Sequence, residues 1–550
     1  MARGCLWLPA LLSLLTMTKS KGQQLGLMAQ AEQIASEFSL SSEHVRRVTK
    51  HLVRQLKDGL ANERPWQLPA YLQSIPTGTE KGQFLAVDLG GSNCRICMAE
   101  LHGDSTFTVL QSKHRVPPSV MVNQSYLPLF DFIARHIAEF VDAHLDPNSQ
   151  SPYKLGFTFS FTCEQESLNG GRLIHWDKGW DIPQAVGRDP CVMLQEAIDR
   201  MGIPVQVTVL ANDSVGTLLT RSYCSGQGIS TLGAVIFGTG TNAAYVEKLS
   251  NVRRLKSTKA NVDGIMVINS EWGSLDDEMK VLPRTPLDDE LDSASVDTGF
   301  GMLEKRVSGL YLGELLRLAI LKLLRASAFD MTVAEQSCLF RRDGIDSSLL
   351  SHLAISKSID SAVRLLQDTL SAKSVSNTDA EAIKLIAEAI ARRAARLSGA
   401  SLAAVIIQSG RLETSSRKFL NRVPSRTTSI SPYSLQSFYS YAPLLLRHLL
   451  DFVRLLCKRP SWMLPKHPPD ADSTPLPGDI IDIGADGSVI ESYPTFEAEM
   501  RGAMREVAEI GPAGEQRVRI TLTKDGSGVG AALMAHAASL AETGRPVNCG

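Results

Sequence analysis

The sequence lacks an excess of charge of either sign. Its 57 lysines and arginines are matched by 58 aspartates and glutamates, so the formal net charge is −1 at pH 7. A protein that binds nucleic acid needs surplus basic side chains against the phosphates, and a general attraction to anionic membranes needs them too. The balance therefore argues against nucleic acid as a partner and favours a small molecule.

Cysteines are few and form no framework. The chain has nine of them, an odd number without repeated spacing, which is typical of reduced thiols in an intracellular compartment. Cys94 and Cys97 make one C-x-x-C, but no second cysteine or histidine pair lies at zinc spacing. The sequence therefore predicts no zinc site, and the body of the chain is typical of a cytoplasmic protein.

The N-terminus has no apolar run of membrane-spanning length. The run from Cys5 to Leu15 is too short to cross a bilayer as a helix. Three interpretations stay open for residues 1–23: a secretory signal, an apolar tail that docks weakly on a membrane, and an upstream extension before a start at Met17 or Met28.

Two glycine-rich turns each follow an apolar strand. FLAVDL contains Asp88 and leads into Gly90 and Gly91, and TLGAVIF leads into GTGTN at 238–242. Glycine without a Cβ lets a phosphate approach the backbone amides of such a turn. Two such hairpins, each opening a strand-rich half, predict an internally duplicated α/β fold with the turns facing each other across a cleft.

Other segments predict further strands and helices. Apolar runs typical of strands lie at 154–161, 205–213 and within 478–490. Helical periodicity is found at 41–60, 127–143, 309–324 and 379–407, the last running into a buried strand, and a glycine turn enters a helix at 525–542.

The segment VLANDSVGTLL, 209–219, ends a strand with an amide and a carboxylate, Asn212 and Asp213. Asn, Asp and Ser are the usual residues where a strand passes into a helix, so one interpretation is a helix cap. The other is a catalytic carboxylate at the end of a buried strand. The segment alone leaves both open.

In order and spacing, these segments resemble those of the eukaryotic hexokinases, as a divergent member of fungal type, from around Gln24 to Ala541 apart from one insertion. The matching segments are FLAVDLGGSNCRI, LGFTFSFTCEQ, IHWDKGWDI, LANDSVGTL, IFGTGTNAAYVE, INSEWGS, LEKRVSGLYLGELLR and DGSGVGAAL. The resemblance implies the α/β fold of the actin-like ATPases (ribonuclease H-like), duplicated into two lobes around a cleft for sugar and ATP.

The resemblance also implies a division of the chain. The expected parts are an apolar extension at 1–23, a helical segment packing on the large lobe at 24–83, a small lobe at 84–212, a large lobe at 213–541, and an insertion within it at 414–477.

By resemblance, the chain is an ATP-dependent hexose kinase in which Asp213 is the general base, assistance that contributes about 10²- to 10⁴-fold in rate. Lys178 is expected to act with it. The implied sugar contacts are Ser160, Asp177, Lys178, Asn212, Asp213, Asn242, Glu271 and Glu304. Carboxylates, amides and one ammonium suit a ligand whose hydroxyls both donate and accept.

The ATP side is implied in the same way. Asp88 resembles the carboxylate that holds Mg²⁺ largely through water, and Gly526, Ser527 and Gly528 are expected at the adenosine end. The implied phosphate contacts are Gly90, Gly91, Ser92, Asn93, Arg95, Thr217, Gly238, Thr239, Gly240 and Thr241.

Several pocket positions depart from the family's pattern. The family commonly has W-T-K-G-F where this chain has WDKGW at 176–180, which puts Asp177 in place of a threonine, and S-F-P where it has SFT at 160–162. Ahead of Glu304 the family's N-P-G-Q-Q is DTGFG at 297–301, so Gly301 stands for a glutamine. The added room near C2 of the sugar would admit a 2-acetamido group, which makes N-acetylglucosamine a substrate hypothesis beside glucose.

The same departures, including Thr162 and Phe300, support a rival interpretation, a catalytically weak sugar sensor that keeps the fold. The retained Asp213, Lys178 and both phosphate turns favour the active kinase.

The insertion from Thr414 to Pro477 is rich in Ser and Pro at both ends and apolar in the middle. One interpretation is a helix that binds a partner or a membrane surface, and the other is a retained intron, since the insert separates two core segments.

The expected location of the protein is the cytoplasm, or the outer surface of mitochondria if residues 1–16 are translated. The sequence does not indicate the oligomeric state.

Overall fold

The structure of the 550-residue chain is a computed structural model, and it describes residues 26–91, 93–176, 179–226, 228–255, 263–412 and 479–542. The predicted extension at 1–23 and the predicted insertion at 414–477 lie outside the described residues, so both interpretations of the insertion stay open.

The first half of the chain forms a five-stranded sheet in the order β4-β3-β2-β5-β8. β2 (Lys81–Leu89) and β3 (Asn93–His102) form the hairpin predicted around the first glycine turn, and β4 (Phe107–Arg115) extends it. β5 (Tyr153–Phe159) runs parallel to both β2 and β8 (Val205–Ala211). The carboxyl ends of these three strands therefore lie at one edge, where α/β sheets bind ligands.

Both faces of this sheet are buried. Cys94 belongs to the core formed with α4 (Leu127–His144) and α5 (Pro190–Met201), whereas Cys97 belongs to the core formed with α6 (Asp213–Ser225) and α19 (Gly526–Glu542). Residues three apart on a strand point to opposite faces, so this C-x-x-C cannot hold one metal ion between its thiols.

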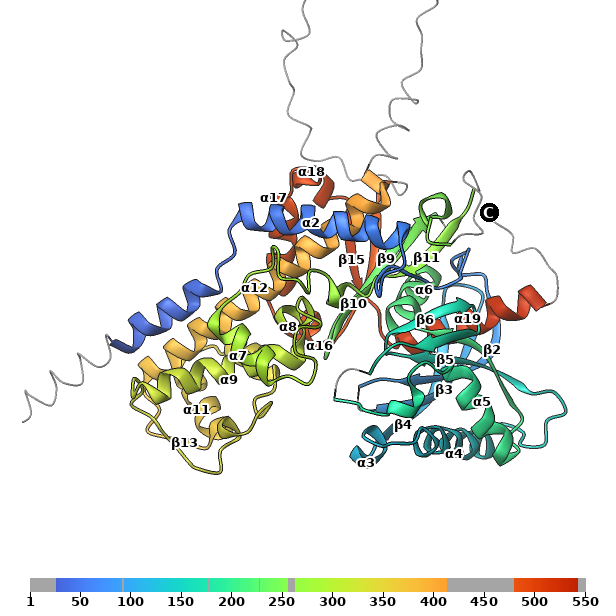
Figure 1. The fold of residues 1–550 in the computed structure, drawn as a ribbon, viewed down its shortest axis with the longest axis horizontal. Helices are drawn as coiled ribbons and strands as arrows, with labels where there is room; N and C mark the ends of the chain where they lie inside the picture. The colour runs from blue at the N-terminus through green and yellow to red at the C-terminus, as the bar shows by residue number, and fades with distance from the viewer. Residues whose placement is uncertain are drawn as a thin grey trace, which may run out of the picture. The chain divides into compact units, whose positions relative to one another are not determined.

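The second half forms a six-stranded sheet in the order β1-β11-β10-β9-β14-β15. β9 (Thr231–Phe237) and β10 (Thr241–Lys248) form the second predicted hairpin. β11 (Ile265–Asn269) and the short β1 (Leu68–Pro69) follow on one side, and the parallel strands β14 (Ile481–Asp486) and β15 (Val518–Leu522) on the other. Two sheets, each with a glycine hairpin, confirm the predicted α/β class (Figure 1).

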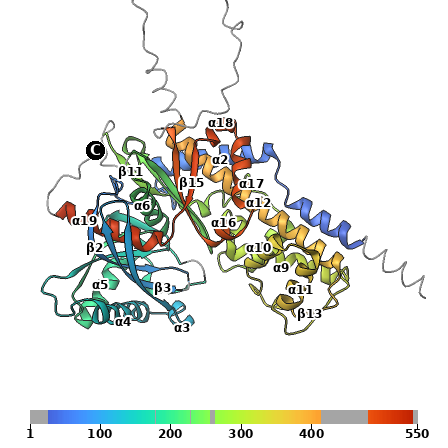
Figure 2. The same ribbon diagram turned by 180° about the vertical axis from the view of Figure 1, so that it is seen from behind.

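Helices α6 and α19 pack on each other between the two sheets (Figure 2). α6 contacts β9 and β14, and α19 contacts β2, β5 and β8. The two backbones touch directly, because a Cβ built on Gly530 would lie 2.1 Å from the Cα of Gly216. The predicted large lobe, 213–541, thus includes a helix that packs on the first sheet, and its boundaries stay a prediction.

A buried ion pair ties α6 to the second sheet. Arg221 donates from Nη2 and Nε to the two oxygens of Asp482 at 2.7 and 2.9 Å, and Arg519 donates to the same carboxylate. Burial alone would raise the pKa of Asp482, but the hydrogen bonds from Arg221, Arg519 and Thr231 hold that pKa below its usual value. The helix that begins at Asp213 is therefore fixed to β14 by charge as well as by packing.

The helical layer beside the second sheet is built around α12 (Asn377–Ser409), which packs on α2 (Ser42–Ala61) and α17 (Phe496–Glu506). Figure 1 shows blue α2 beside orange α12. Ser41 is the N-cap of α2, and its hydroxyl accepts from the His44 N–H. The expectation of a strand at the end of 379–407 is wrong: α12 continues to a left-handed Gly410, because packing decides the conformation of a buried apolar segment over the propensity of Val and Ile.

The described residues contain further elements that complete these layers. They are α3 (Pro118–Met121), β6 (Cys163–Ser167), β7 (Gly170–Leu173), α7 (Pro286–Ala294), α8 (Glu304–Val307), α9 (Gly309–Arg325), β12 (Thr332–Val333), α10 (Ser348–Ile355), α11 (Ile359–Leu370), β13 (Ala372–Lys373), α16 (Ser488–Ser492), α18 (Gly511–Glu515) and a helix at 26–37. Of all the helices in the described ranges, none is long and apolar enough to cross a membrane.

Candidate active site

Two carboxylates lie at the carboxyl edge of the first sheet. Asp88 is the penultimate residue of β2, and Asp213 opens α6 two residues after β8 ends. Burial raises the pKa of Asp88, Arg95 opposes that rise, and the charge of Asp213 adds to it. The fold thus brings both predicted residues, 125 positions apart in the chain, within electrostatic reach of each other.

The cap and the carboxylate are separate residues. Asn212 is the N-cap of α6 and accepts the Ser214 N–H on Oδ1 at 2.9 Å. Asp213 is the first helical residue, and its Oδ1 accepts the same N–H at 2.8 Å. The N-cap position is filled by the neighbouring amide, so Asp213 is available for the other interpretation that the sequence left open.

A chain of amides runs from Asn212 toward Glu271. Asn242 donates from Nδ2 to Asn212 Oδ1 at 3.2 Å and to Asn269 Oδ1 at 2.8 Å, and Asn269 donates to Glu271 Oε1 at 2.8 Å. The structure therefore brings together three predicted sugar contacts and adds Asn269, which the sequence analysis missed. Its signal is the one that marked Asn212, an amide at the end of an apolar strand.

Glu304, the first residue of α8, contacts the predicted second phosphate turn. Its Oε2 accepts the Thr241 N–H at 2.8 Å, and the Thr241 hydroxyl accepts from Trp272 Nε1 at 3.0 Å. A Cβ on Gly273 would lie 3.2 Å from Glu304 Cβ, so this glycine allows the two loops to approach. The predicted phosphate turn and a predicted sugar contact are thus held against each other.

The predicted first phosphate turn is held by side chains from separate segments of the chain. Asp88 Oδ2 accepts from Arg95 Nη1 at 3.1 Å and from Ser527 Oγ at 2.7 Å, and Gly90 N–H donates to the Asn93 carbonyl at 3.0 Å. Further predicted ATP contacts lie near this turn. A Cβ built on Gly526 would lie 2.8 Å from Thr217 Oγ1. Gly528 lines a small cavity together with Asp88 and Arg95.

Trp180 also holds this turn. Its indole Nε1 donates to the Gly91 carbonyl at 2.7 Å, and its ring stacks on Trp176. Trp180 stands where the hexokinase pattern has phenylalanine, and its role was not predictable from the sequence. Phenylalanine could fill the same apolar space without the donor.

We expect Trp180→Phe to raise the KM for ATP by roughly three- to tenfold while the KM for hexose stays unchanged, because a lost hydrogen bond of about 1 kcal/mol loosens the turn. Steady-state kinetics would measure both constants. Trp176→Phe is the matched control, since Trp176 is similarly buried and donates to Ile182 instead. An equal rise of the ATP constant in both variants would contradict a role specific to Trp180.

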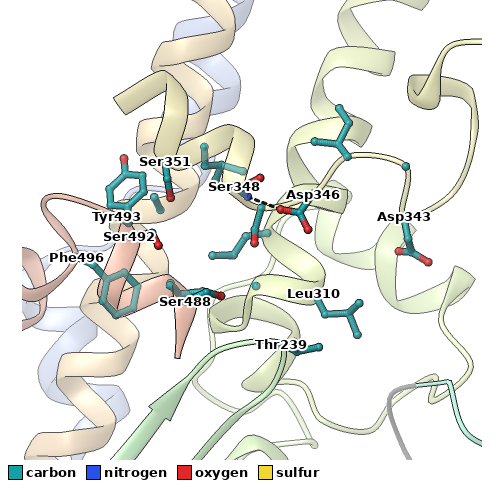
Figure 3. Close-up of a pocket in the computed structure, with 18 residues that line it drawn as sticks. Thr239, Leu310, Asp343, Asp346, Ser348, Ser351, Ser488, Ser492, Tyr493 and Phe496 are labelled. Carbon is teal, nitrogen blue, oxygen red and sulfur yellow. Dashed lines mark hydrogen bonds between the residues drawn. The ribbon is translucent and has the colours of Figure 1, made fainter. Parts of the chain in front are cut away.

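The predicted second phosphate turn borders a cavity of about 310 Å³. Gly309 and Leu310 donate backbone N–H groups to the carbonyls of Gly238 and Thr239 at 2.7 and 3.2 Å. Figure 3 shows Ser488, Ser492, Tyr493 and Phe496 on one side of the cavity, Leu310, Asp343 and Asp346 on the other, and Thr239 at its lower end. The lining combines apolar surface with hydroxyls and two carboxylates, but it does not include Gly526, Ser527 or Gly528.

Asp486 is a further acidic residue that the sequence analysis did not single out. It ends β14 and accepts the Gly487 N–H at 2.7 Å. Burial raises its pKa to about 6, the charge of Asp213 adds to the rise, and Arg95 opposes it. The pattern is that of Asp88, an aspartate at the end of an apolar strand.

Three predicted residues, Ser92, Asp177 and Lys178, lie outside the described residues. Ser160 is buried, and its N–H donates to the Leu89 carbonyl at 3.2 Å. Gly301 has a left-handed φ of 64°, and the nearest atom to a Cβ built there is Glu304 Cβ at 3.9 Å.

Comparisons with known proteins show what this chain is similar to. Family models described as Hexokinase match residues 30–223 and 232–537. A glucokinase of Aspergillus niger is 38% identical over 94% of this chain and 99% of its own length, and glucokinase-1 of Saccharomyces cerevisiae is 32% identical over 94% and 98%. A hexokinase of Schistosoma mansoni, solved with glucose, superposes with a TM-score of 0.73 at 26% identity, covering 94% of this chain and 99% of that one.

Proposed function

Because this chain belongs to the hexokinase family and is therefore a hexose phosphotransferase with the actin-like two-lobed fold, we propose that it transfers the γ-phosphoryl group of ATP to the 6-hydroxyl of glucose. The observation that carries the proposal is the set of side chains around Asp213: Asp88 lies within electrostatic reach, and the amide chain from Asn212 leads to Glu271.

Asp213 is the proposed general base. The primary hydroxyl of a sugar is a poor nucleophile at neutral pH, so a carboxylate must accept its proton as the phosphoryl group arrives. Asp213 lies beyond the carboxyl end of β8, in the parallel part of the first sheet, and its carboxylate is bonded to the Ser214 N–H. Lys178, the other residue expected to act in catalysis, lies outside the described residues.

The two glycine turns would bind the phosphates. Phosphoryl transfer depends mainly on alignment and on neutralising charge, which Arg95 and the amides of both turns can supply. Asp88 at the first turn offers a carboxylate oxygen, the type of ligand that Mg²⁺ prefers, so it would hold the ion together with water and the nucleotide itself. That ion would supply charge stabilisation to the phosphates.

We place the nucleoside of ATP in the 310 Å³ cavity, a volume within the range of small-molecule pockets, roughly 300 to 1,000 Å³. Thr239 belongs both to the cavity wall and to the second phosphate turn, so a base in the cavity would direct its phosphates toward Asp88 and Asp213. The acceptor-rich lining suits an exocyclic amine and ribose hydroxyls. Residues 526–528, which we expected at the adenosine end, adjoin Asp88 and better suit the phosphates.

Glucose is the proposed hexose because the similar proteins are named glucokinases and the similar structure holds glucose. N-acetylglucosamine is the second candidate, favoured by the absence of a side chain at Gly301, where the nearest atom to a built Cβ is Glu304 Cβ at 3.9 Å. One such change in a pocket alters affinity by only about 1 to 3 kcal/mol, so direct competition between sugars is needed.

A coupled ADP-release assay with Mg²⁺-ATP tests both points. We expect turnover with glucose, and turnover with N-acetylglucosamine if the room at Gly301 is used. Glucose, fructose, mannose, glucosamine and N-acetylglucosamine would be compared. Reaction of glucose alone would reject the 2-acetamido hypothesis. No reaction with any sugar, in folded protein, would favour the sensor, which the changed positions Asp177, Thr162 and Gly301 support.

A further inference from the structure

Asp277 connects two loops that carry sugar-contacting carboxylates. It lies six residues after Glu271, on the loop that follows β11. Its Oδ1 accepts the Met302 N–H at 2.8 Å, and the Gly301 N–H is a second donor to the same carboxylate. The carboxylate thus bonds two consecutive amides of the loop that leads into Glu304.

The amides that Asp277 holds belong to the turn on which α8 starts. The Gly301 carbonyl accepts the Lys305 N–H at 2.9 Å, so its peptide is bonded on both sides. Glu304 is the first residue of that helix, and its carboxylate accepts the Thr241 N–H. A shift of the 301–302 peptides would therefore move Glu304 directly.

The loop that carries Asp277 is itself fixed to α2. The neighbouring Asp276 accepts three consecutive N–H groups, those of 280–282, and His51 of α2 lies 3.1 Å from its Oδ1. Gln55 of α2 accepts the Asp276 N–H at 3.0 Å. Asp277 therefore lies on a loop that is bonded to α2, and the position of the 301–302 peptides depends on the position of that loop.

We propose that Asp277 is a positioning residue that sets Glu304 relative to Glu271 for the same hexose and makes hexose affinity depend on pH. The inference rests on the proposed function, since it takes both glutamates to contact the sugar. Glu304 would lose its position when the bonds to the 301 and 302 amides weaken, whereas Asp213, fixed at the start of α6, would keep its own.

The pH dependence has a defined direction. Burial raises the pKa of Asp277 to about 6, against the bonds from Met302 and Gly301 and the charge of Lys305, while Asp276 adds to the rise. Above that pKa the ionised carboxylate accepts both amides. Below it, the added proton removes charge and one acceptor site, so affinity for hexose falls as the pH falls through about 6.

The test is the affinity of Asp277→Asn for glucose between pH 5 and 8. Isothermal titration calorimetry measures the dissociation constant without turnover, and steady-state assays give kcat and KM. We expect glucose binding about tenfold weaker at pH 7.5 in the variant, as for a lost charge-assisted bond, with kcat changed by less than about twofold. The fall in wild-type affinity below pH 6 should be absent from the variant.

Two further variants test whether a loss of affinity is specific to the carboxylate of Asp277. Asp379→Asn is the matched control, because Asp379 is a buried carboxylate that accepts backbone N–H groups of 330 and 331, and it should leave glucose affinity unchanged. Asp277→Glu keeps two acceptor oxygens and should recover part of the affinity and its pH dependence, which decides the matter if the asparagine variant does not fold.

Wild-type affinity that does not change with pH, or equal affinity in wild type and Asp277→Asn, would overturn the inference. If the wild type binds glucose but does not phosphorylate it, the proposed function is wrong. Calorimetry would then still test the role of Asp277 in glucose binding. Failure of the wild type to bind any hexose would overturn both.

Discussion

Asp213→Asn is expected to lower kcat for glucose by about 10²- to 10⁴-fold while the dissociation constant for glucose changes little. The amide has the shape of the carboxylate and can still accept the Ser214 N–H, but it cannot take the proton of the 6-hydroxyl. Single-turnover measurements with saturating Mg²⁺-ATP would isolate the chemical step, and calorimetry would report binding.

Asp360→Asn provides the control for this substitution. Asp360 is an exposed aspartate in the first turn of α11, so like Asp213 it lies at the N-terminal end of a helix, but it lies in no candidate site. Its replacement should leave kcat unchanged. A kcat of Asp213→Asn above one-tenth of the wild-type value would show that another group accepts the proton.

The contact between α6 and α19 gives the second large expected effect. Gly530→Ala should destabilise the protein by about 3 kcal/mol, the upper end of the usual cost of overpacking. The new methyl group would lie 2.1 Å from the Cα of Gly216, and this atom belongs to a backbone that cannot rotate away. Urea denaturation followed by circular dichroism would measure the change.

Gly502→Ala, in α17, is the matched substitution. No heavy atom lies within 4 Å of a Cβ built at that position, and alanine is favoured over glycine in a helix by roughly 0.5 to 1 kcal/mol. This variant should therefore be slightly more stable than the wild type. A loss below about 1 kcal/mol for Gly530→Ala would mean that the helices separate easily, which contradicts direct backbone packing.

The sequence predicted those parts of the site that have a local pattern. An apolar run that ends in Asp88 or Asn212 marks a strand with its functional end, because the strand period and the following turn are both visible within ten or so residues. The two glycine hairpins were predictable for the same reason, since their strands are neighbours in the chain.

The parts that were missed depend on contacts between distant segments. Asn269 meets Asn242 across two antiparallel strands, and the indole of Trp180 reaches Gly91 from another loop. The cavity is lined by residues from five separate stretches, near 239, 309–312, 343–351, 391 and 488–496. The glycine turn at 239 is marked by its composition, but nothing in the sequence indicates that the other stretches meet beside it, so only the folded chain reveals the cavity.

The glycine pair at 216 and 530 also limits how this sequence can change. In most protein cores a larger side chain at one position can be accommodated by a smaller one opposite it, so sequences drift through paired substitutions while the volume is conserved. Neither Gly216 nor Gly530 has a side chain that a smaller one could replace. The two positions can vary only if the helices themselves move apart, and such a movement would displace Asp213 at the start of one helix and Ser527, with its bond to Asp88, at the start of the other.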